Sequence, residues 1–171
     1  MSKFFDPTLP APPPSLRRLV ALTGVKHARK HMGTALAMKR AWAFLKEGKF
    51  VYTKIRGVAK VPVRQEALRR LLQYEPEQIR LRLVREPKNQ HDPYAVQVQV
   101  TANGSKPYHI GYLSEKRAPW VATLLDEGVW VSAEMSQITG GSGNKKFGMN
   151  VLLEIDHPDL KIVSQPEMRP F

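Results

Sequence analysis

The chain has 171 residues, of which 42% are hydrophobic and 25% charged, as in a soluble protein with one domain and an appendage. Its 27 lysine and arginine residues against 15 acidic ones give a net charge of +12, so nucleic acid or an anionic membrane surface comes first among partners. The absence of cysteine excludes disulfides and cysteine-ligated zinc, and no apolar run approaches the ~20 residues that span a bilayer. We therefore expect a soluble cytoplasmic protein, nucleoid-associated if it is bacterial.

The first 48 residues carry most of this charge. They hold nine basic and two acidic residues, a net of +7. Residues 1–14 are rich in proline and should be extended. Residues 15–48 predict a basic helical extension, with a short helix from Ser15 and a longer one over 26–46. The longer helix has an apolar face, and on another face it has four basic residues that we expect to contact phosphates: Lys26, Arg29, Lys30 and Arg40. Packing on its own domain or lying on an anionic membrane are the alternatives for such a helix.

From residue 50 the pattern becomes mostly strand-like. Alternating apolar residues predict strands over 50–60, 79–84, 95–100, 108–113, 129–139 and 147–155. Helices are predicted over 63–73 and 118–127, because Pro119 suits a first helical turn. Asn103-Gly104 is a hairpin turn, and a glycine-rich loop covers 140–146. We expect a domain over 50–155 of mostly-β or α+β class, a small six-stranded β-barrel of the OB or SH3 type with two short helices, followed by an irregular tail over 156–171.

Three segments together resemble the HIRAN domain family. Residues 83–96 (LVREPKNQHDPYAV) resemble its central motif, and residues 109–113 (HIGYL) and a helix ending in LLDEG follow in the family's order. Residues 64–68 (RQEAL) resemble a helix start common among bacterial members, so that the match covers roughly 50–155. The resemblance implies a compact barrel that binds single-stranded DNA. In a fork-remodelling relative this module captures the 3′-hydroxyl end, in replication and repair; elsewhere it stands alone in bacteria and phages.

The resemblance also assigns roles to individual residues. Asp92 matches the position that meets the 3′-hydroxyl, because a carboxylate accepts hydrogen bonds from a hydroxyl and repels a terminal phosphate. Phe147 matches a stacking aromatic residue, Tyr112 stands where the relative has histidine, and His91 replaces a tyrosine. Contacts with the DNA backbone are expected from four basic residues: Lys60, Arg64, Lys145 and Lys146.

Each of these residues also has a structural interpretation. Asp92 before Pro93 is typical of a capped turn, while Phe147 and Tyr112 suit core positions. Lys145 and Lys146 suit the solvated tip of a hairpin.

Rival functions have weaker support. His27 and His31 share a helix face but lack a nearby carboxylate to complete a metal site, and the loop over 140–146 lacks the glycine-lysine-hydroxyl ending of a P-loop. With no Ser-His-Asp or paired-carboxylate arrangement, we expect neither enzymatic activity nor a cofactor or metal. A protein-interaction adaptor that recruits a helicase or nuclease, and a binder of RNA or duplex DNA, remain as alternatives.

Overall fold

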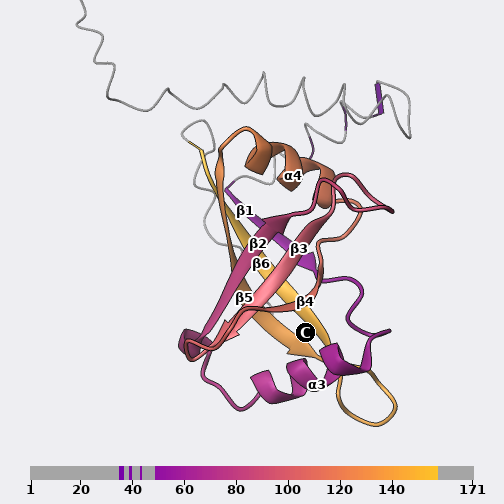
Figure 1. Cartoon of the computed structure of the whole chain (residues 1–171), viewed down its shortest axis with the longest axis vertical. Coiled ribbons are helices and arrows are strands. Elements are labelled where there is room, and N and C mark those ends of the chain that lie inside the picture. The colour runs from indigo at the N-terminus through magenta and orange to yellow at the C-terminus, as the bar shows by residue number, and fades with distance from the viewer. Residues whose placement is uncertain (1–34, 37–38, 40–42, 44–48, 158–171) are drawn as a thin grey trace, which may run out of the picture.

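The computed structural model describes residues 35–36, 39, 43 and 49–157 (Figure 1). Ala35, Leu36, Lys39 and Ala43 are helical, in the region where the sequence predicts the longer N-terminal helix. The proline-rich start, the rest of the basic extension and residues 158–171 lie outside the described residues. In the part of the chain that is described, no helix is long and apolar enough to cross a membrane.

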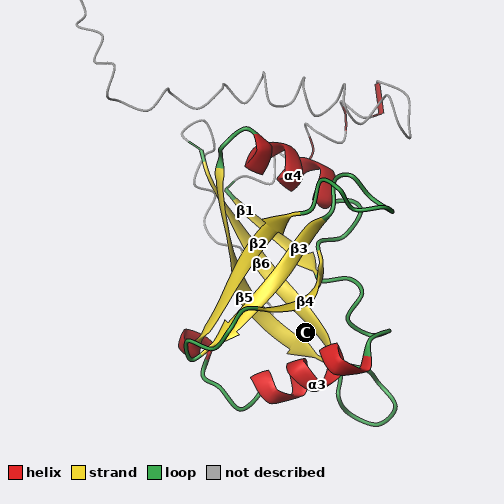
Figure 2. Ribbon diagram, viewed as in Figure 1, coloured by secondary structure: helices red, strands yellow, loops and turns green. Residues whose placement is uncertain are grey.

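Two helices and six strands follow in the order expected (Figure 2). The elements are β1 (Phe50–Lys54), α3 (Pro62–Leu71), β2 (Ile79–Arg85), β3 (Val96–Ala102), β4 (Tyr108–Tyr112), α4 (Ala118–Asp126), β5 (Trp130–Thr139) and β6 (Gly148–Asp156). The largest departure from prediction is β1, which ends at Lys54 instead of residue 60, because the chain turns at Gly57 with a φ of +78°. A 3₁₀ turn over Pro76–Gln78, capped by Glu75, was not predicted.

The strands form two antiparallel sheets of three strands, in the orders β1-β6-β5 and β2-β3-β4. The predicted α+β class and the six strands are confirmed, but among the described residues no closed barrel is seen. One isolated bridge, between Arg56 and Tyr112, joins the exit of β1 to β4. Gly111 permits this approach, since a Cβ there would lie 2.4 Å from the carbonyl oxygen of Arg56. The Asn103-Gly104 turn is confirmed, with φ angles of 47° and 73°.

The core lies between the inner faces of the two sheets. Val96, Val98 and Val100 alternate inward on β3, and Val151 and Leu153 do so on β6. Figure 1 places α3 and α4 at opposite ends of the strands. The apolar stripe of α3 buries Leu68 and Leu71, and α4 is buried along most of its length around Trp120. Burying apolar side chains stabilises the fold by about 25 cal/mol for each Å² removed from water. The outer faces of the sheets carry mostly polar residues, with the exposed Trp130 of β5 as an exception.

Candidate nucleic-acid interface

A β-bulge in β4 places two aromatic rings on one face. Val98 pairs with Gly111 and Gln99 with His109, which leaves Ile110 as an extra residue in β4. Residues three apart in a regular strand point to opposite faces, and the bulge removes that restriction. The rings of His109 and Tyr112 consequently meet edge to face, with centroids 4.7 Å apart, on the outer face of β4.

Arg64, from the first turn of α3, lies against both rings. Its guanidinium carbon lies 5.9 Å from the centroid of the Tyr112 ring, and its Nη2 donates to His109 Nδ1 at 3.2 Å. Its Nη1 donates to the carbonyl of Gly57 at 3.0 Å, which fixes the side chain over the turn after β1. The chain therefore presents a positive charge directly beside an aromatic ring.

His109 is held in one tautomer by its partners. Arginine only donates hydrogen bonds and a backbone carbonyl only accepts them. With Arg64 donating to Nδ1, the proton must lie on Nε2, which donates to the carbonyl of Gly111 at 2.9 Å. Burial, with Arg64 adjacent, lowers the pKa of His109 below its ordinary value, so the imidazole is neutral at pH 7.

Glu86, at the end of β2, anchors the other side of Tyr112. The Tyr112 hydroxyl donates to the Glu86 carboxylate, and the side chains of Gln97 and Asn89 hydrogen-bond the same carboxylate. These bonds, that from Gln97 foremost, hold the pKa of Glu86 below its ordinary value, so the group is an anion. Burial in turn raises the pKa of Tyr112. Tyr112 is thus fixed between a cation and an anion.

Asn89 connects this network to the loop that carries Asp92. Its Oδ1 accepts the backbone N–H groups of His91 at 2.9 Å and Asp92 at 3.0 Å, while its Nδ2 donates to Glu86 at 3.1 Å. Asp92 Oδ1 accepts the N–H of Tyr94 at 2.8 Å, which is the capped turn expected before Pro93. The second oxygen of Asp92 accepts no hydrogen bond from the described residues. The His91 side chain is exposed.

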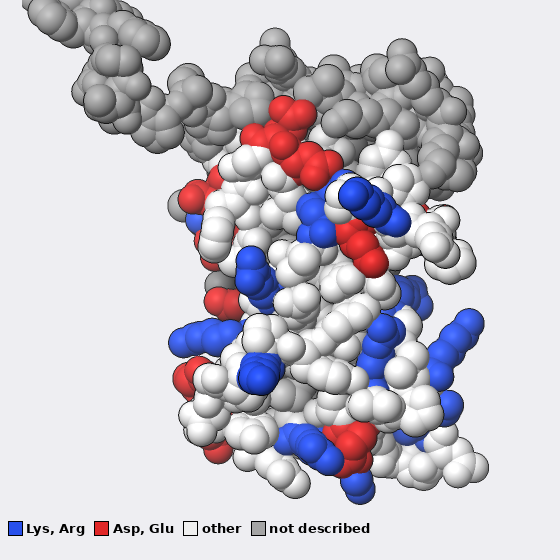
Figure 3. Space-filling view, in the orientation of Figure 1, with Lys and Arg blue, Asp and Glu red and all other residues white. Residues whose placement is uncertain are grey.

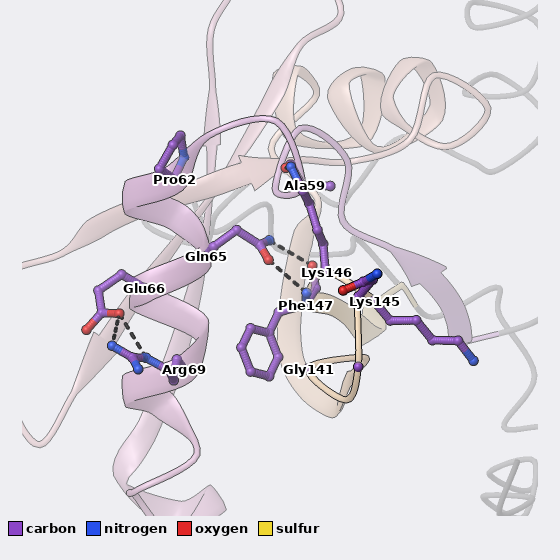
Figure 4. Close-up of a pocket in the computed structure, with 11 residues that line it drawn as sticks. Ala59, Pro62, Gln65, Glu66, Arg69, Gly141, Lys145, Lys146 and Phe147 are labelled. Carbon is purple, nitrogen blue, oxygen red and sulfur yellow. Dashed lines mark hydrogen bonds and ion pairs between the residues drawn. The ribbon is translucent and has the colours of Figure 1, made fainter.

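A groove of about 490 Å³ lies between α3 and the loop over 140–147 (Figure 4). Gln65 holds its two walls together: its Oε1 accepts the Phe147 N–H at 2.8 Å, and its Nε2 donates to the Phe147 carbonyl at 2.9 Å. The half-buried Phe147 ring lines the groove against Gly141, where a Cβ would overlap it. Lys145 and Lys146 line the same groove, and Lys146 Nζ donates to the Ala59 carbonyl at 3.1 Å.

The predicted site residues thus fall into three groups, with Lys60 outside them. Arg64 and Tyr112 are in contact, and Phe147 lines a groove with Lys145 and Lys146. His91 and Asp92 lie on the loop that Asn89 ties to Glu86, and Lys60 is exposed in the turn before α3. The adjacent residues Arg64 and Gln65 of α3 contact Tyr112 and Phe147 respectively, which connects two of the groups. The phosphate contacts expected of the N-terminal extension lie outside the described residues.

Several residues of the network were not predicted from sequence: Gln65, Glu86, Asn89, Gln97 and His109. Two signals for them were present. Glu86 and Asn89 belong to the motif segment over 83–96, and the glycine within the strand over 108–113 is typical of a bulge. In the part of the chain that the structure describes, no group of three or more His, Cys, Asp or Glu side chains is arranged to hold a metal.

Comparison with known proteins defines the class of this fold and site. The model of the HIRAN domain matches residues 51–156, which is more than half of the chain. The chain therefore belongs to the HIRAN domain family, and the resemblance seen in its sequence is confirmed. The family implies a non-catalytic DNA-binding module.

No curated protein matches the chain. Among solved structures, the chain is similar to a crystal structure of a protein from Lactobacillus plantarum, with 20% sequence identity and a TM-score of 0.43. That match covers 60% of this chain and 91% of the other.

Proposed function

We propose that this protein binds single-stranded DNA without catalysis and receives the strand at the pair formed by Arg64 and Tyr112. The observation that carries the proposal is the Tyr112 ring, fixed on the outer face of β4 beside the Arg64 guanidinium. An unpaired base stacks on such a ring, a contact worth ~1–3 kcal/mol, while the guanidinium binds the adjacent phosphate. Duplex DNA hides its base faces, so this arrangement favours a single strand.

The 3′ end of the strand is assigned to Asp92. Its Oδ1 stabilises the turn, whereas its other oxygen accepts no hydrogen bond from the described residues and is available for a terminal hydroxyl. A terminal phosphate would meet the carboxylate charge and be repelled. The exposed His91 ring beside it offers a face for the terminal base.

The groove beside Phe147 serves a second part of the strand. Phe147 supplies an aromatic wall, and Lys145, Lys146 and the exposed Lys60 supply cations for phosphates. The basic residues Lys26, Arg29, Lys30 and Arg40 of the N-terminal extension add further phosphate contacts. Single-stranded ends of this kind arise in replication and repair, where a helicase or nuclease is the natural partner.

Fluorescence anisotropy with three oligonucleotides of equal length tests the proposal: a single strand ending in a 3′-hydroxyl, the same strand ending in a 3′-phosphate, and a blunt duplex. We expect the hydroxyl strand to bind most tightly. Asp92→Asn removes the charge and keeps the turn acceptor, so the two single strands should then bind alike.

Equal binding of the wild-type protein to both single strands would contradict end capture and leave general single-strand binding. Tighter binding to the duplex, or to an RNA strand of the same sequence, would assign a different nucleic acid. Binding to none of them would favour the adaptor function.

A further inference from the structure

A second set of basic residues lies outside the site described above, on the outer face of β2. Arg80 and Arg82 are exposed and alternate with the inward-facing Ile79, Leu81 and Leu83. Residues two apart in a strand lie about 6.7 Å from each other on the same face. The two guanidinium groups therefore point outward together, and their like charges repel each other unless an anion lies near them.

These two arginines differ from three other described arginines, each of which pairs with a carboxylate. Arg69 and Arg70 both pair with the Glu66 carboxylate, and Arg85 forms an ion pair with Asp126 at 2.8 Å. Arg80 and Arg82 make no ion pair or side-chain hydrogen bond within the described residues. Their cross-strand neighbours on β3 are the uncharged Thr101 and Gln99.

Sheet register connects this pair to the proposed site. Arg82 pairs with Gln99, and Gln99 pairs with His109, so the three side chains form one row across β2, β3 and β4. Directly opposed residues share a face, and two strand spacings separate Arg82 from His109 by about 10 Å. A single strand with one nucleotide bound at Tyr112 therefore reaches Arg82 within a few nucleotides.

The face between them is mostly polar, although Val84 of β2 lies on it in register with Gln97 and Tyr112. Gln97 and Gln99 alternate with the buried Val96, Val98 and Val100 on β3, and their amides can donate to phosphates and bases. Figure 3 shows lysine and arginine side chains spread over this side of the molecule, with the largest group of acidic side chains near α4.

We propose that the outer face of the β2-β3-β4 sheet, from His109 through Gln99 to Arg82 and Arg80, is a path for single-stranded DNA beyond the nucleotides held at Tyr112. The proposal rests on the proposed function, since it extends the same strand across the sheet. Arg80 and Arg82 bind successive phosphates of the strand.

Strand length provides the test. Binding of the full chain is measured against a strand of about 4 nucleotides, which fills the site at Tyr112, and one of about 16, which also crosses the sheet. The double variant Arg80→Gln with Arg82→Gln should lower the affinity for the longer strand about tenfold. Its affinity for the shorter strand should be unchanged. Each lost phosphate contact should also reduce the slope of log affinity against log salt by about 0.7 for the longer strand.

Single variants give a matched control. Arg82→Gln is compared with Lys49→Gln, which removes one charge from the start of the opposite sheet, where Lys49 pairs with Glu154 at 2.7 Å. Lys49→Gln should change neither affinity nor slope.

Three outcomes would overturn the path. In the first, the double variant loses as much affinity for the shorter strand as for the longer one. In the second, Arg82→Gln loses no more affinity than Lys49→Gln. In the third, the double variant loses more affinity for duplex DNA than for the single strand. A wild-type protein that binds neither strand would instead remove the proposed function, and the path with it.

Discussion

Tyr112 is the residue on which the proposed DNA site depends most. Tyr112→Leu removes the ring and should weaken binding to a single strand by ~1–3 kcal/mol. Tyr112→Phe keeps the ring, loses only the hydroxyl bond to Glu86, and should have a smaller effect. Tyr74→Leu is the control, because Tyr74 is 38% exposed and lies beyond the end of α3. Anisotropy titrations of the three variants measure their affinity for a single strand. Equal losses of affinity in Tyr112→Leu and Tyr74→Leu would argue against stacking at this site.

His109 should make stability depend on pH. Its folded pKa is lowered below 6.5, so its contribution is fully present above that value and is lost as pH falls toward the folded pKa. Protonation also places a hydrogen on Nδ1, where Arg64 now donates. Urea unfolding at about pH 8 and about pH 5.5 should show lower stability at the lower pH.

His109→Gln should reduce that difference, because glutamine does not titrate. The lowered pKa of Glu86 adds a similar loss only below its ordinary value of 4.5, so the two groups act in different pH ranges. An unchanged pH dependence in His109→Gln would assign the effect to another group.

The sequence predicted which residues belong to the candidate site better than it predicted which of their side chains are in contact. Arg64 and Tyr112 were both identified, but their contact depends on Gly57, which turns the chain after β1, and on the bulge at Ile110. The interpretation of Asp92 as the cap of a turn is confirmed. Its role at a 3′ end stays a prediction, as do the roles of the lysines.

At the scale of elements, α3 and β6 depend on each other through Gln65. Its side chain bonds both backbone groups of Phe147 and also donates to the carbonyl of Val58 at 3.2 Å. Gln65→Ala leaves these part-buried groups unpaired and should lower the free energy of unfolding by about 2 kcal/mol. Affinity for a single strand should fall as well, because Phe147 loses its support. Gln73→Ala, at an exposed position just after α3, should be nearly neutral in both measurements. Similar losses in the two variants would contradict a stabilising role for the Gln65 side chain.

Element type and order could be predicted because most strand residues alternate, α3 has an apolar stripe, and Pro119 marks the first turn of the largely apolar α4. The bulge in β4 could not be derived from that alternation, which places His109 and Tyr112 on opposite faces. Only Gly111 signals it. The early end of β1 at Lys54 has a similar origin, since Ile55 is buried after the strand has ended and keeps the alternation that Val51 begins.

At the scale of the whole molecule, strand alternation indicates which face of each strand is buried but not which edges are joined. Two three-stranded sheets and one bridge at Arg56 therefore replace the closed barrel that was expected. The positive charge is clearer from sequence, because composition alone gives +12. Composition does not give the distribution of that charge. The structure shows that Arg69, Arg70 and Arg85 pair with carboxylates, whereas Arg64, Arg80 and Arg82 make no ion pair within the described residues.

The central claim is that single-stranded DNA binds at Arg64 and Tyr112, and mapping the residues that the strand contacts tests it most directly. At 19.4 kDa the full chain suits backbone amide NMR, titrated with a short single-stranded oligonucleotide that ends in a 3′-hydroxyl. We predict shifts that cluster at Arg64 and Gln65, in the loop carrying Asp92, at His109 and Tyr112, and at Phe147. Shifts confined to β1, β5 and β6, with Arg64 and Tyr112 unchanged, would contradict the account.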